Sequence, residues 1–371
     1  MIVSWAVEEG FDRAGIVRLR PSEHAEAFER WLGRGDQASM AYLERRRAER
    51  LDPRRLFEGA RSALCVARQY HPGGDRAELP PESVLHHVAR YARGTDYHDL
   101  LKKRLVRLAA RIEEAFPGAT TRPYVDTGPV LERELAARAG IGSFGKNTNL
   151  LHPEAGSWFF LGEIFTTLDL ELATPVADLC GSCTRCLEAC PTGALPEPYR
   201  LDATRCISYW TIEHRGWLPE EARQLPGDWI FGCDVCQEVC PVNEDGAVSV
   251  ESALEPDPRR RQLKVLDLLD LSRRSYVELF RGSPMKRAKL EGLQRNAVLW
   301  LAHRGGEEAE DALVGALRHD EPLVRGHAAW GLGRLAGAAA RRALEKALEG
   351  EPEPEVREEI RSALGRVSEG S

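Results

Sequence analysis

Residues 180–191 read CGSCTRCLEACP, and residues 233–241 read CDVCQEVCP. The first run matches the spacing C-x2-C-x2-C-x3-C-P, which is typical of bacterial ferredoxins. In that pattern three closely spaced thiolates bind one 4Fe–4S cluster, and the fourth cysteine, before the proline, binds a second cluster. The second run repeats the end of the pattern but lacks its first cysteine, and Cys206 is the spare cysteine nearby. The spacing therefore predicts a ferredoxin-like domain with two 4Fe–4S clusters.

The cysteines of this region divide into two sets of four. We assign Cys180, Cys183, Cys186 and Cys240 to one cluster, and Cys190, Cys206, Cys233 and Cys236 to the other. Zinc is the alternative, because it also takes four thiolates and often binds C-x2-C pairs. Zinc does not explain why a C-x3-C-P ending occurs twice. The ninth cysteine, Cys65, lies in the apolar run SALCVARQY and is predicted to be a buried core thiol.

The composition indicates a globular protein of two or three domains. The chain has 371 residues, of which 43% are hydrophobic and 29% charged, and its net charge of −7 gives no general signal for nucleic acid. No run approaches the ~20 apolar residues of a membrane span. The N-terminal sequence MIVSWAVEEGFDRAG shows no secretory signal. We therefore expect a cytoplasmic protein without membrane association, in a compartment that keeps thiols reduced.

The order of motifs predicts an α+β multidomain chain. Residues 1–170 mix helical patterns at 24–35 and 97–116 with strand-like runs at 62–70 and 159–170, which indicates an α+β or α/β domain. Residues 171–250 form the ferredoxin-like cluster domain, and residues 251–371 form a helical domain. The stretch EPDPRRRQ, residues 255–262, is interpreted as a linker between them.

The C-terminal domain contains an internal repeat. RGHAAWGLGRL from Arg325 and REEIRSALGRV from Arg357 share R-x6-L-G-R, and RNAVLWLAHRG from Arg295 is a looser copy. Repeats of this length typically form paired helices, so we expect a short HEAT-like solenoid that offers an extended surface to a macromolecule. A plain helical bundle with chance similarity is the alternative.

The glycine-rich loop AGIGSFGKN, residues 139–147, superficially resembles a nucleotide site. A dinucleotide-binding fingerprint follows a strand and opens a helix, whereas this loop follows a predicted helix, DTGPVLERELAARAG. In that helix Asp126 and Thr127 would cap the start, Pro129 would lie in the first turn, and Gly140 would take the left-handed position after the end. A P-loop would need Ser or Thr where Asn147 stands. Nucleotide binding is therefore not expected here, and an ordinary turn remains the alternative.

Basic residues cluster in two segments of this acidic chain. One group is Arg45, Arg46, Arg47, Arg50, Arg54 and Arg55, and the other is Arg259, Arg260, Arg261, Lys264, Lys286, Arg287 and Lys289. Such clusters favour a phosphate-rich partner. Solvated helix faces with interleaved glutamates would give the same pattern.

Several of these motifs together resemble the epoxyqueuosine reductase family. The resemblance rests on YVDTGPVLERELAARAGIGSFGKNTNLL, HPEAGSWFFLGEIFTT, CGSCTRCLEACPTGAL, RCISYWTIEHRG and FGCDVCQEVCPVN, and it covers most of the chain. Two departures are Ser143, where relatives often carry an aromatic residue, and Gly128, which replaces a more usual alanine. Membership would imply reduction of epoxyqueuosine at the wobble position of tRNA, with cobalamin and two 4Fe–4S clusters as cofactors.

The resemblance also implies roles for individual residues. Asp126 would contact the cofactor and act as general acid, a role that competes with the simple helix N-cap. Lys146, Asn147, Ser208 and Gln237 would contact cobalamin, whereas Glu132, Glu134 and Glu163 are weaker candidates for a second carboxylate. No D-x-H-x-x-G pattern is present, which agrees with base-off cobalamin that lacks a histidine ligand from the protein. The N-terminal domain would then be the cobalamin-binding domain.

The implied partners are the tRNA anticodon stem-loop carrying epoxyqueuosine, held by the helical repeats, and an external low-potential electron donor. We expect a monomer. Two other classes remain open from the sequence. One is a different cobalamin reductase, such as a reductive dehalogenase, and the other is an electron carrier without an active site of its own.

Overall fold

The computed structural model describes residues 1–71, 73, 78–244, 246 and 248–369. Contacts divide them into two compact units, each assembled from segments that are distant in the sequence. The first unit draws on residues 1–73, 94–206 and 234–255, and the second on residues 74–93, 207–233 and 256–371. The consecutive domain boundaries expected from the sequence stay a prediction. Within the described residues, no helix is long and apolar enough to cross a membrane.

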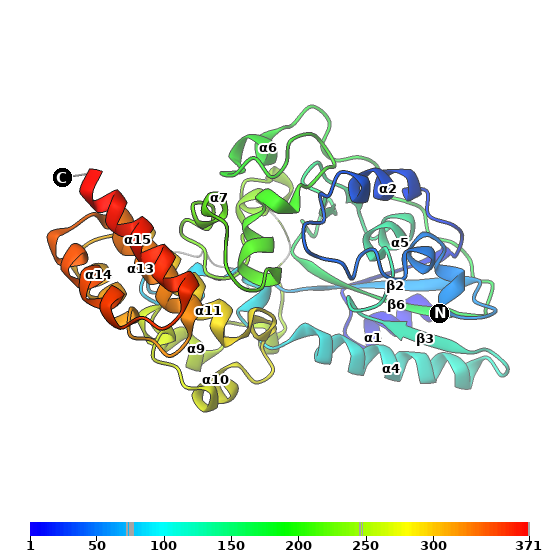
Figure 1. Ribbon diagram of the computed structural model, residues 1–371. Coiled ribbons are helices and arrows are strands. Elements are labelled where there is room, and N and C mark those ends of the chain that lie inside the picture. The colour runs from blue at the N-terminus through cyan, green and yellow to red at the C-terminus, as the bar shows by residue number, and fades with distance from the viewer. Residues whose placement is uncertain (72, 74–77, 245, 247, 370–371) are drawn as a thin grey trace. The chain divides into compact units, whose positions relative to one another are not determined.

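An antiparallel four-stranded sheet lies at the centre of the first unit (Figure 1). Its strands, in spatial order, are β1 (Arg13–Arg18), β2 (Ser62–Gln69), β6 (Phe159–Thr166) and β3 (Thr121–Tyr124). Cys65 on β2 pairs with Glu163 on β6, and Glu163 pairs in turn with Tyr124 on β3. Cross-strand partners point to the same face, so these three side chains form one row across the sheet. Cys65 is fully buried, as predicted.

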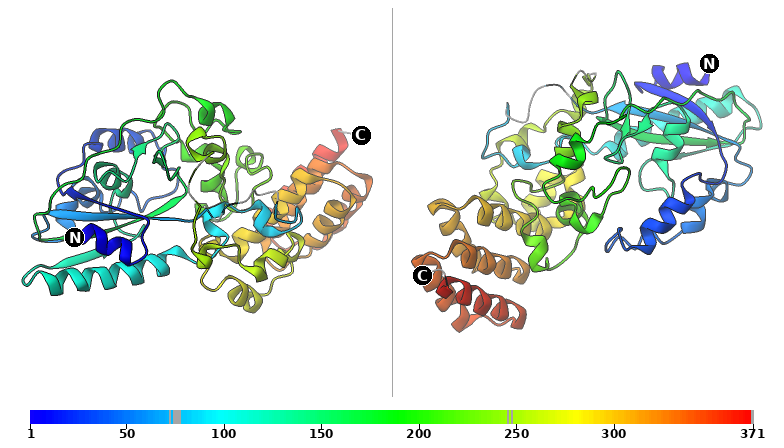
Figure 2. Two further views of the ribbon diagram at one scale, coloured as in Figure 1. Left: turned by 180° about the vertical axis from the view of Figure 1, so that it is seen from behind. Right: turned by 90° about the horizontal axis from the view of Figure 1, so that it is seen from above.

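Helices cover the two faces of this sheet (Figures 1 and 2). Helix α4 (Tyr97–Ala115) packs on the face that contains Gly162, where a Cβ would lie 2.9 Å from the side chain of Leu105. Helix α5 (Glu132–Arg138) packs with Cys65 on the opposite face. The other elements of the first unit are α1 (Ile2–Glu8), α2 (Ala25–Gly33), α3 (Arg47–Leu51), α6 (Arg185–Ala189), α8 (Val235–Glu238) and the strand pair β4 (Ser143–Phe144) and β5 (Leu150–Leu151).

Two sequence expectations about local structure are wrong in part. The helix expected from residue 126 begins only at Glu132, with Leu131 at its N-cap, because Asp126 has a left-handed φ of +50° that a helix start does not allow. The expected linker contains helix α9 (Pro258–Gln262), which the Asp257 carboxylate caps by accepting two backbone N–H groups. The helices and strands expected near residues 24–35, 62–70, 97–116 and 159–170 are confirmed.

The second unit is mainly helical. The three sequence repeats fall on α11 (Lys289–Arg304), α13 (Pro322–Leu335) and α15 (Pro354–Glu369), with α12 (Glu307–Ala316) and α14 (Ala338–Gly350) between them (Figures 1 and 2). Helix α13 packs against both α11 and α15. The unit also contains α7 (Glu220–Arg223), α9, α10 (Arg273–Phe280) and a π-helix at Tyr209–Glu213.

The arginine that opens each repeat has a structural function. Arg325 and Arg357 each donate to two backbone carbonyls of the loop before their own helix, at 2.8–3.0 Å. Arg295 is 1% exposed and donates to the carbonyls of Trp210 and Gly216 at 2.8 and 3.0 Å. Burial lowers the pKa of Arg295 to about 9. The repeated arginine thus satisfies carbonyl groups that would otherwise lack donors.

Candidate functional site

Four cysteines of the first unit form one group of thiols. Cys186, on α6, and Cys240, after α8, are both buried. Burial raises the pKa of the Cys186 thiol, and the nearby thiols of Cys180, Cys240 and Cys183 raise it further. Burial and the thiols of Cys180 and Cys183 also raise the pKa of Cys240. These four thiols therefore lie near enough to affect one another's charge, and their assignment to one cluster stays a prediction.

The second set of cysteines lies in both units. Cys190, Cys206 and Cys236 belong to the first unit, and Cys233 belongs to the second. The Cys190 sulfur accepts the backbone N–H of Ala194 at 3.3 Å. The assignment of these four residues to a second cluster stays a prediction.

The glycine-rich loop lies against the protein itself. It follows α5 and runs into β4, so the order of elements is the reverse of a dinucleotide-binding turn. Gly140 has the expected left-handed φ of +73°, and a Cβ there would lie 2.4 Å from the carbonyl oxygen of Thr174. A Cβ on Gly142 would lie 2.7 Å from the carbonyl oxygen of Leu151. Internal packing is therefore sufficient to require these glycines.

Lys146 and Asn147, at the end of this loop, contact the cysteine segments. The Lys146 ammonium donates to the carbonyl oxygens of Gly181 and Cys183 at 2.7 and 2.9 Å. The Asn147 side-chain amide donates to the carbonyl oxygen of Cys236 at 3.0 Å. Both side chains thus donate to backbone carbonyl oxygens of the protein, whereas the resemblance implied that they would contact cobalamin.

The remaining two expected cofactor contacts differ in their surroundings. The Gln237 amide donates to the Ser157 hydroxyl at 3.0 Å and to the Ser157 carbonyl at 3.2 Å. Ser208 is half-buried directly before the π-helix of the second unit. Their contact with a cofactor stays a prediction.

Asp126 stands at the centre of a polar group in the first unit. Its Oδ2 accepts hydrogen bonds from the Tyr97 hydroxyl at 3.0 Å and from His98 Nε2 at 2.9 Å. The second ring nitrogen of His98 lies 2.7 Å from Asp96 Oδ1. The backbone N–H of Asp126 donates to the Glu132 carboxylate. About half of the Asp126 side chain, 54%, is exposed, so the carboxylate remains accessible to a substrate.

The start of α4 places three of these residues. Asp96 is the N-cap, since its side chain accepts the backbone N–H of His98 at 3.1 Å. The Tyr97 ring stacks on Phe160 of β6, with ring centres 4.0 Å apart. The sequence pattern does not single out Asp96, Tyr97 or His98 as site residues. The segment TDYHD, residues 95–99, is typical of a helix start, and its only signal of a functional site is the pair of carboxylates that flank the histidine.

This arrangement raises the pKa values of two side chains beside Asp126, those of His98 and Glu132. Burial lowers the pKa of His98, but its hydrogen bonds with Asp126 and Asp96 outweigh burial and raise the pKa to about 9. Burial and the nearby Asp126 charge raise the pKa of Glu132 to about 8. At neutral pH the site therefore contains an imidazolium and a neutral carboxylic acid.

Glu163 is a further buried carboxyl close to this site. It is fully buried on β6, and neither oxygen has a hydrogen-bond partner among the described residues. Burial, together with the charges of Glu132 and Asp126, raises its pKa well above the ordinary value. The hydroxyl groups of Tyr124 and Ser143 are also shielded from solvent without a partner in the described chain. Gly128 lies beside Tyr124, because a Cβ there would be 2.8 Å from its ring.

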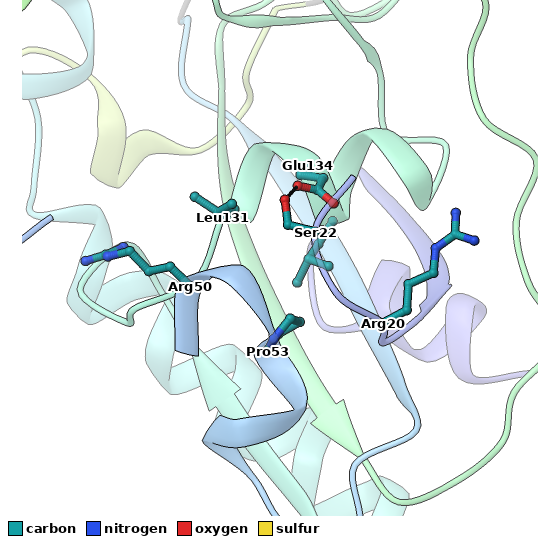
Figure 3. A pocket seen from close by; sticks show the side chains of 7 residues that line it. Arg20, Ser22, Arg50, Pro53, Leu131 and Glu134 are labelled. Carbon is teal, nitrogen blue, oxygen red and sulfur yellow. Dashed lines mark hydrogen bonds between the residues drawn. The ribbon is translucent and has the colours of Figure 1, made fainter. Parts of the chain in front are cut away.

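Glu134 has a different environment, in a small pocket beside α5 (Figure 3). The pocket is lined by Arg20, Ser22, Arg50, Pro53, Leu131, Glu134 and Leu135. The Glu134 carboxylate accepts hydrogen bonds from the Ser22 hydroxyl and from the backbone N–H of Glu23 at 3.0 Å. Figure 3 shows Ser22 and Glu134 pointing toward each other, with Arg20 and Arg50 directed away. Glu134 therefore connects the N-terminal segment to α5.

Several arginines of the two basic clusters are paired with carboxylates. Arg46 binds Glu49 at 3.0 Å and Arg54 binds Asp52 at 2.8 Å. In the second unit Arg259 binds Asp257 at 2.8 Å and Arg287 binds Glu213 at 2.6 Å. Carboxylates thus neutralise part of each cluster. Glu49 and Asp52 are interleaved with the first cluster, as the alternative anticipated, whereas Glu213 comes from a distant segment. Lys286 and Lys289 of the second cluster are exposed.

Family models match three parts of the chain. Residues 179–243 match a 4Fe-4S double cluster binding domain, residues 50–127 match the epoxyqueuosine reductase QueG family, and residues 287–365 match HEAT repeats. An epoxyqueuosine reductase from Xanthomonas campestris is 41% identical over 337 residues, which cover 88% of this chain and 93% of the relative. The chain belongs to the epoxyqueuosine reductase family. The predictions of iron–sulfur clusters and of HEAT-like repeats are thereby confirmed.

Solved structures of the family have the same fold. A crystal structure of an epoxyqueuosine reductase with an epoxyqueuosine-modified stem loop of tyrosine tRNA has a TM-score of 0.90 and 33% identity, and the match covers 99% of this chain and 98% of that one. A Bacillus subtilis family member, whose catalytic aspartate loop is swung out of the active site, has a TM-score of 0.89 and 32% identity over 98% and 97% of the two chains.

Proposed function

We propose that this chain reduces the epoxide of epoxyqueuosine in the wobble position of tRNA and thereby gives queuosine. The reaction consumes two electrons and two protons and releases one water, leaving a carbon–carbon double bond where the epoxide was. The observation that carries this proposal is the accessible Asp126 carboxylate, backed by His98 and Glu132. The membership of the chain in the epoxyqueuosine reductase family supports it.

Asp126 is the proposed catalytic acid. Because His98 is the imidazolium at neutral pH, it can pass its proton across their hydrogen bond to the Asp126 carboxylate, and Asp126 then gives that proton to the epoxide oxygen. Asp96 holds the ring in place through its other nitrogen. The proton on Glu132 is the second proton available beside Asp126. The Bacillus subtilis relative, whose catalytic aspartate loop is swung out of the active site, supports this assignment, since Asp126 also lies in a loop.

The site also fits a base-off cobalamin. The shielded hydroxyl groups of Ser143 and Tyr124 lack partners among the described residues, and the amide side chains of a corrin would supply them. Both His98 nitrogens face carboxylates, so this histidine is not available as a cobalt ligand. When bound, cobalamin supplies a strongly reducing cobalt centre at the epoxide. Among the contacts expected from the sequence, Lys146, Asn147 and Gln237 fit less well, because their ammonium or amide groups bind the polypeptide.

The two sets of cysteines would hold two 4Fe–4S clusters, which would supply electrons one at a time from an external low-potential donor. The tRNA anticodon stem-loop is the proposed macromolecular substrate, as in the relative crystallised with a stem loop. The modified base must leave its stack to reach Asp126. The HEAT repeats and the exposed lysines beside them are the proposed tRNA contacts, in a cytoplasmic monomer.

The first experiment is anaerobic reconstitution with iron, sulfide and hydroxocobalamin, followed by metal analysis and an assay on tRNA that contains epoxyqueuosine. About eight irons and one cobalt per chain, with formation of queuosine, is the expected result. Eight irons with no cobalt and no queuosine would instead indicate an electron carrier.

The Asp126→Asn variant tests the catalytic acid. It should keep both metals and lose turnover, and full activity would exclude Asp126 as the proton donor. In the wild type, activity should fall as the pH rises through about 8, because Glu132 then loses its proton.

A further inference from the structure

Lys146 contacts one cysteine segment at three points. Its ammonium donates to the carbonyl oxygens of Gly181 and Cys183 at 2.7 and 2.9 Å. Its backbone N–H points at the sulfur of Cys180, 3.4 Å away. All three contacts lie within residues 180–183, which carry two members of the first thiol group. The positive charge is therefore held beside this thiol group by carbonyl groups.

The neighbouring backbone keeps Lys146 in this place. The Lys146 carbonyl accepts the backbone N–H of Tyr199 at 3.0 Å. A Cβ on Gly145 would lie 2.8 Å from Asn147 Oδ1, which itself accepts the backbone N–H of Asn149 at 3.2 Å. The side chain of Asn147 continues to the carbonyl of Cys236. The loop is thus fixed on both sides of Lys146.

Charge and hydrogen bonds to sulfur are two properties that set the reduction potential of an iron–sulfur cluster. Reduction adds one negative charge to the cluster. A fixed ammonium nearby stabilises that charge, and an N–H directed at a ligating sulfur does the same. Removing the ammonium should therefore make the cluster harder to reduce.

We propose that Lys146 is a positioning residue that orients residues 180–183 and raises the reduction potential of the cluster bound by Cys180, Cys183, Cys186 and Cys240. This role makes that cluster easier to reduce than it would be without the Lys146 charge. The proposal depends on the iron–sulfur clusters but not on cobalamin or on the tRNA substrate, so its outcome is separate from that of the proposed reaction.

The test is a potentiometric titration of the reconstituted holoenzyme, followed by electron paramagnetic resonance. Lys146→Met removes the charge and the donors, Lys146→Gln removes the charge but keeps a donor, and Lys146→Arg keeps both. Lys103→Met, on the exposed side of α4, is the matched control for loss of a lysine. The Met and Gln variants should lower the midpoint potential of one cluster by about 59 mV, which corresponds to an about tenfold smaller equilibrium constant for its one-electron reduction. The Arg and Lys103 variants should match the wild type.

Unchanged potentials of both clusters in the Met and Gln variants would overturn the proposal. If these variants bind less iron, recovery of the iron content by Lys146→Arg supports the positioning role. Loss of iron in the Arg variant as well would show that neither charge nor donors explain the effect, and the proposal would fail.

Discussion

Replacing Asp126 with asparagine should lower the pKa of His98. The imidazole lies between two carboxylates, with Nε2 at 2.9 Å from Asp126 Oδ2 and Nδ1 at 2.7 Å from Asp96 Oδ1. Burial alone would lower the pKa, yet the two hydrogen bonds bring it from 6.5 to about 9. The protonation of His98 at neutral pH is thus a consequence of these two contacts.

The size of the change follows from the two contacts. An adjacent carboxylate shifts a histidine pKa by about one to three pH units. Because the two carboxylates contact opposite nitrogens at similar distances, each single replacement should lower the pKa by about one to two pH units. Replacing both Asp126 and Asp96 should leave burial as the main influence and bring the pKa of His98 below its ordinary value.

Nuclear magnetic resonance of the protein with isotope-labelled histidine rings measures this pKa directly. The His98→Gln variant identifies the His98 signal, and Asp96→Asn is the matched control that keeps the Asp126 carboxylate. A His98 pKa that stays near 9 in both single variants would refute the reasoning. A pKa that falls in Asp96→Asn but not in Asp126→Asn would show that His98 does not supply protons to Asp126.

Three further predictions concern stability and substrate binding. Asn296→Leu should reduce the free energy of unfolding by about 3–5 kcal/mol. The buried Asn296 amide donates to the carbonyls of Thr211 and Ile230 at 2.9 and 2.8 Å, and its oxygen accepts from Arg295. A loss below about 1 kcal/mol in urea unfolding would contradict this expectation. The folded state keeps the Glu163 proton above pH 4.5 while the unfolded state loses it, so stability should fall as the pH rises toward the folded pKa. Glu163→Gln should flatten that slope in thermal unfolding at several pH values, and an unchanged slope would show that Glu163 is not the group responsible. Replacing exposed Lys286 and Lys289 with glutamine should weaken tRNA binding and reduce its salt dependence by about one phosphate contact each; equal affinity at all salt concentrations would exclude these lysines from the tRNA contact.

Cysteine spacing and hydrophobic periodicity were sufficient to predict the local features of this protein, namely its cluster-binding segment and several helices and strands. The C-x2-C-x2-C-x3-C-P run predicts iron–sulfur clusters because four of the expected ligands lie within one short segment. The amphipathic pattern of α4 and the apolar run of β2 predict their own boundaries, since each depends on side chains a few residues apart. The repeated arginine motif marks α11, α13 and α15 for the same reason.

The chemistry of the candidate site depended on the tertiary structure. Asp126 reads as a helix cap in the sequence, but the chain turns with a left-handed φ there and presents the carboxylate to His98, 28 residues earlier. Lys146 reads as a cofactor ligand, but the fold brings residues 180–183 to its ammonium. Local sequence fixes which groups a segment carries. Which groups meet, and therefore their protonation and charge, is decided by contacts between distant segments, because burial and nearby charges set a pKa and neither is a property of the local sequence.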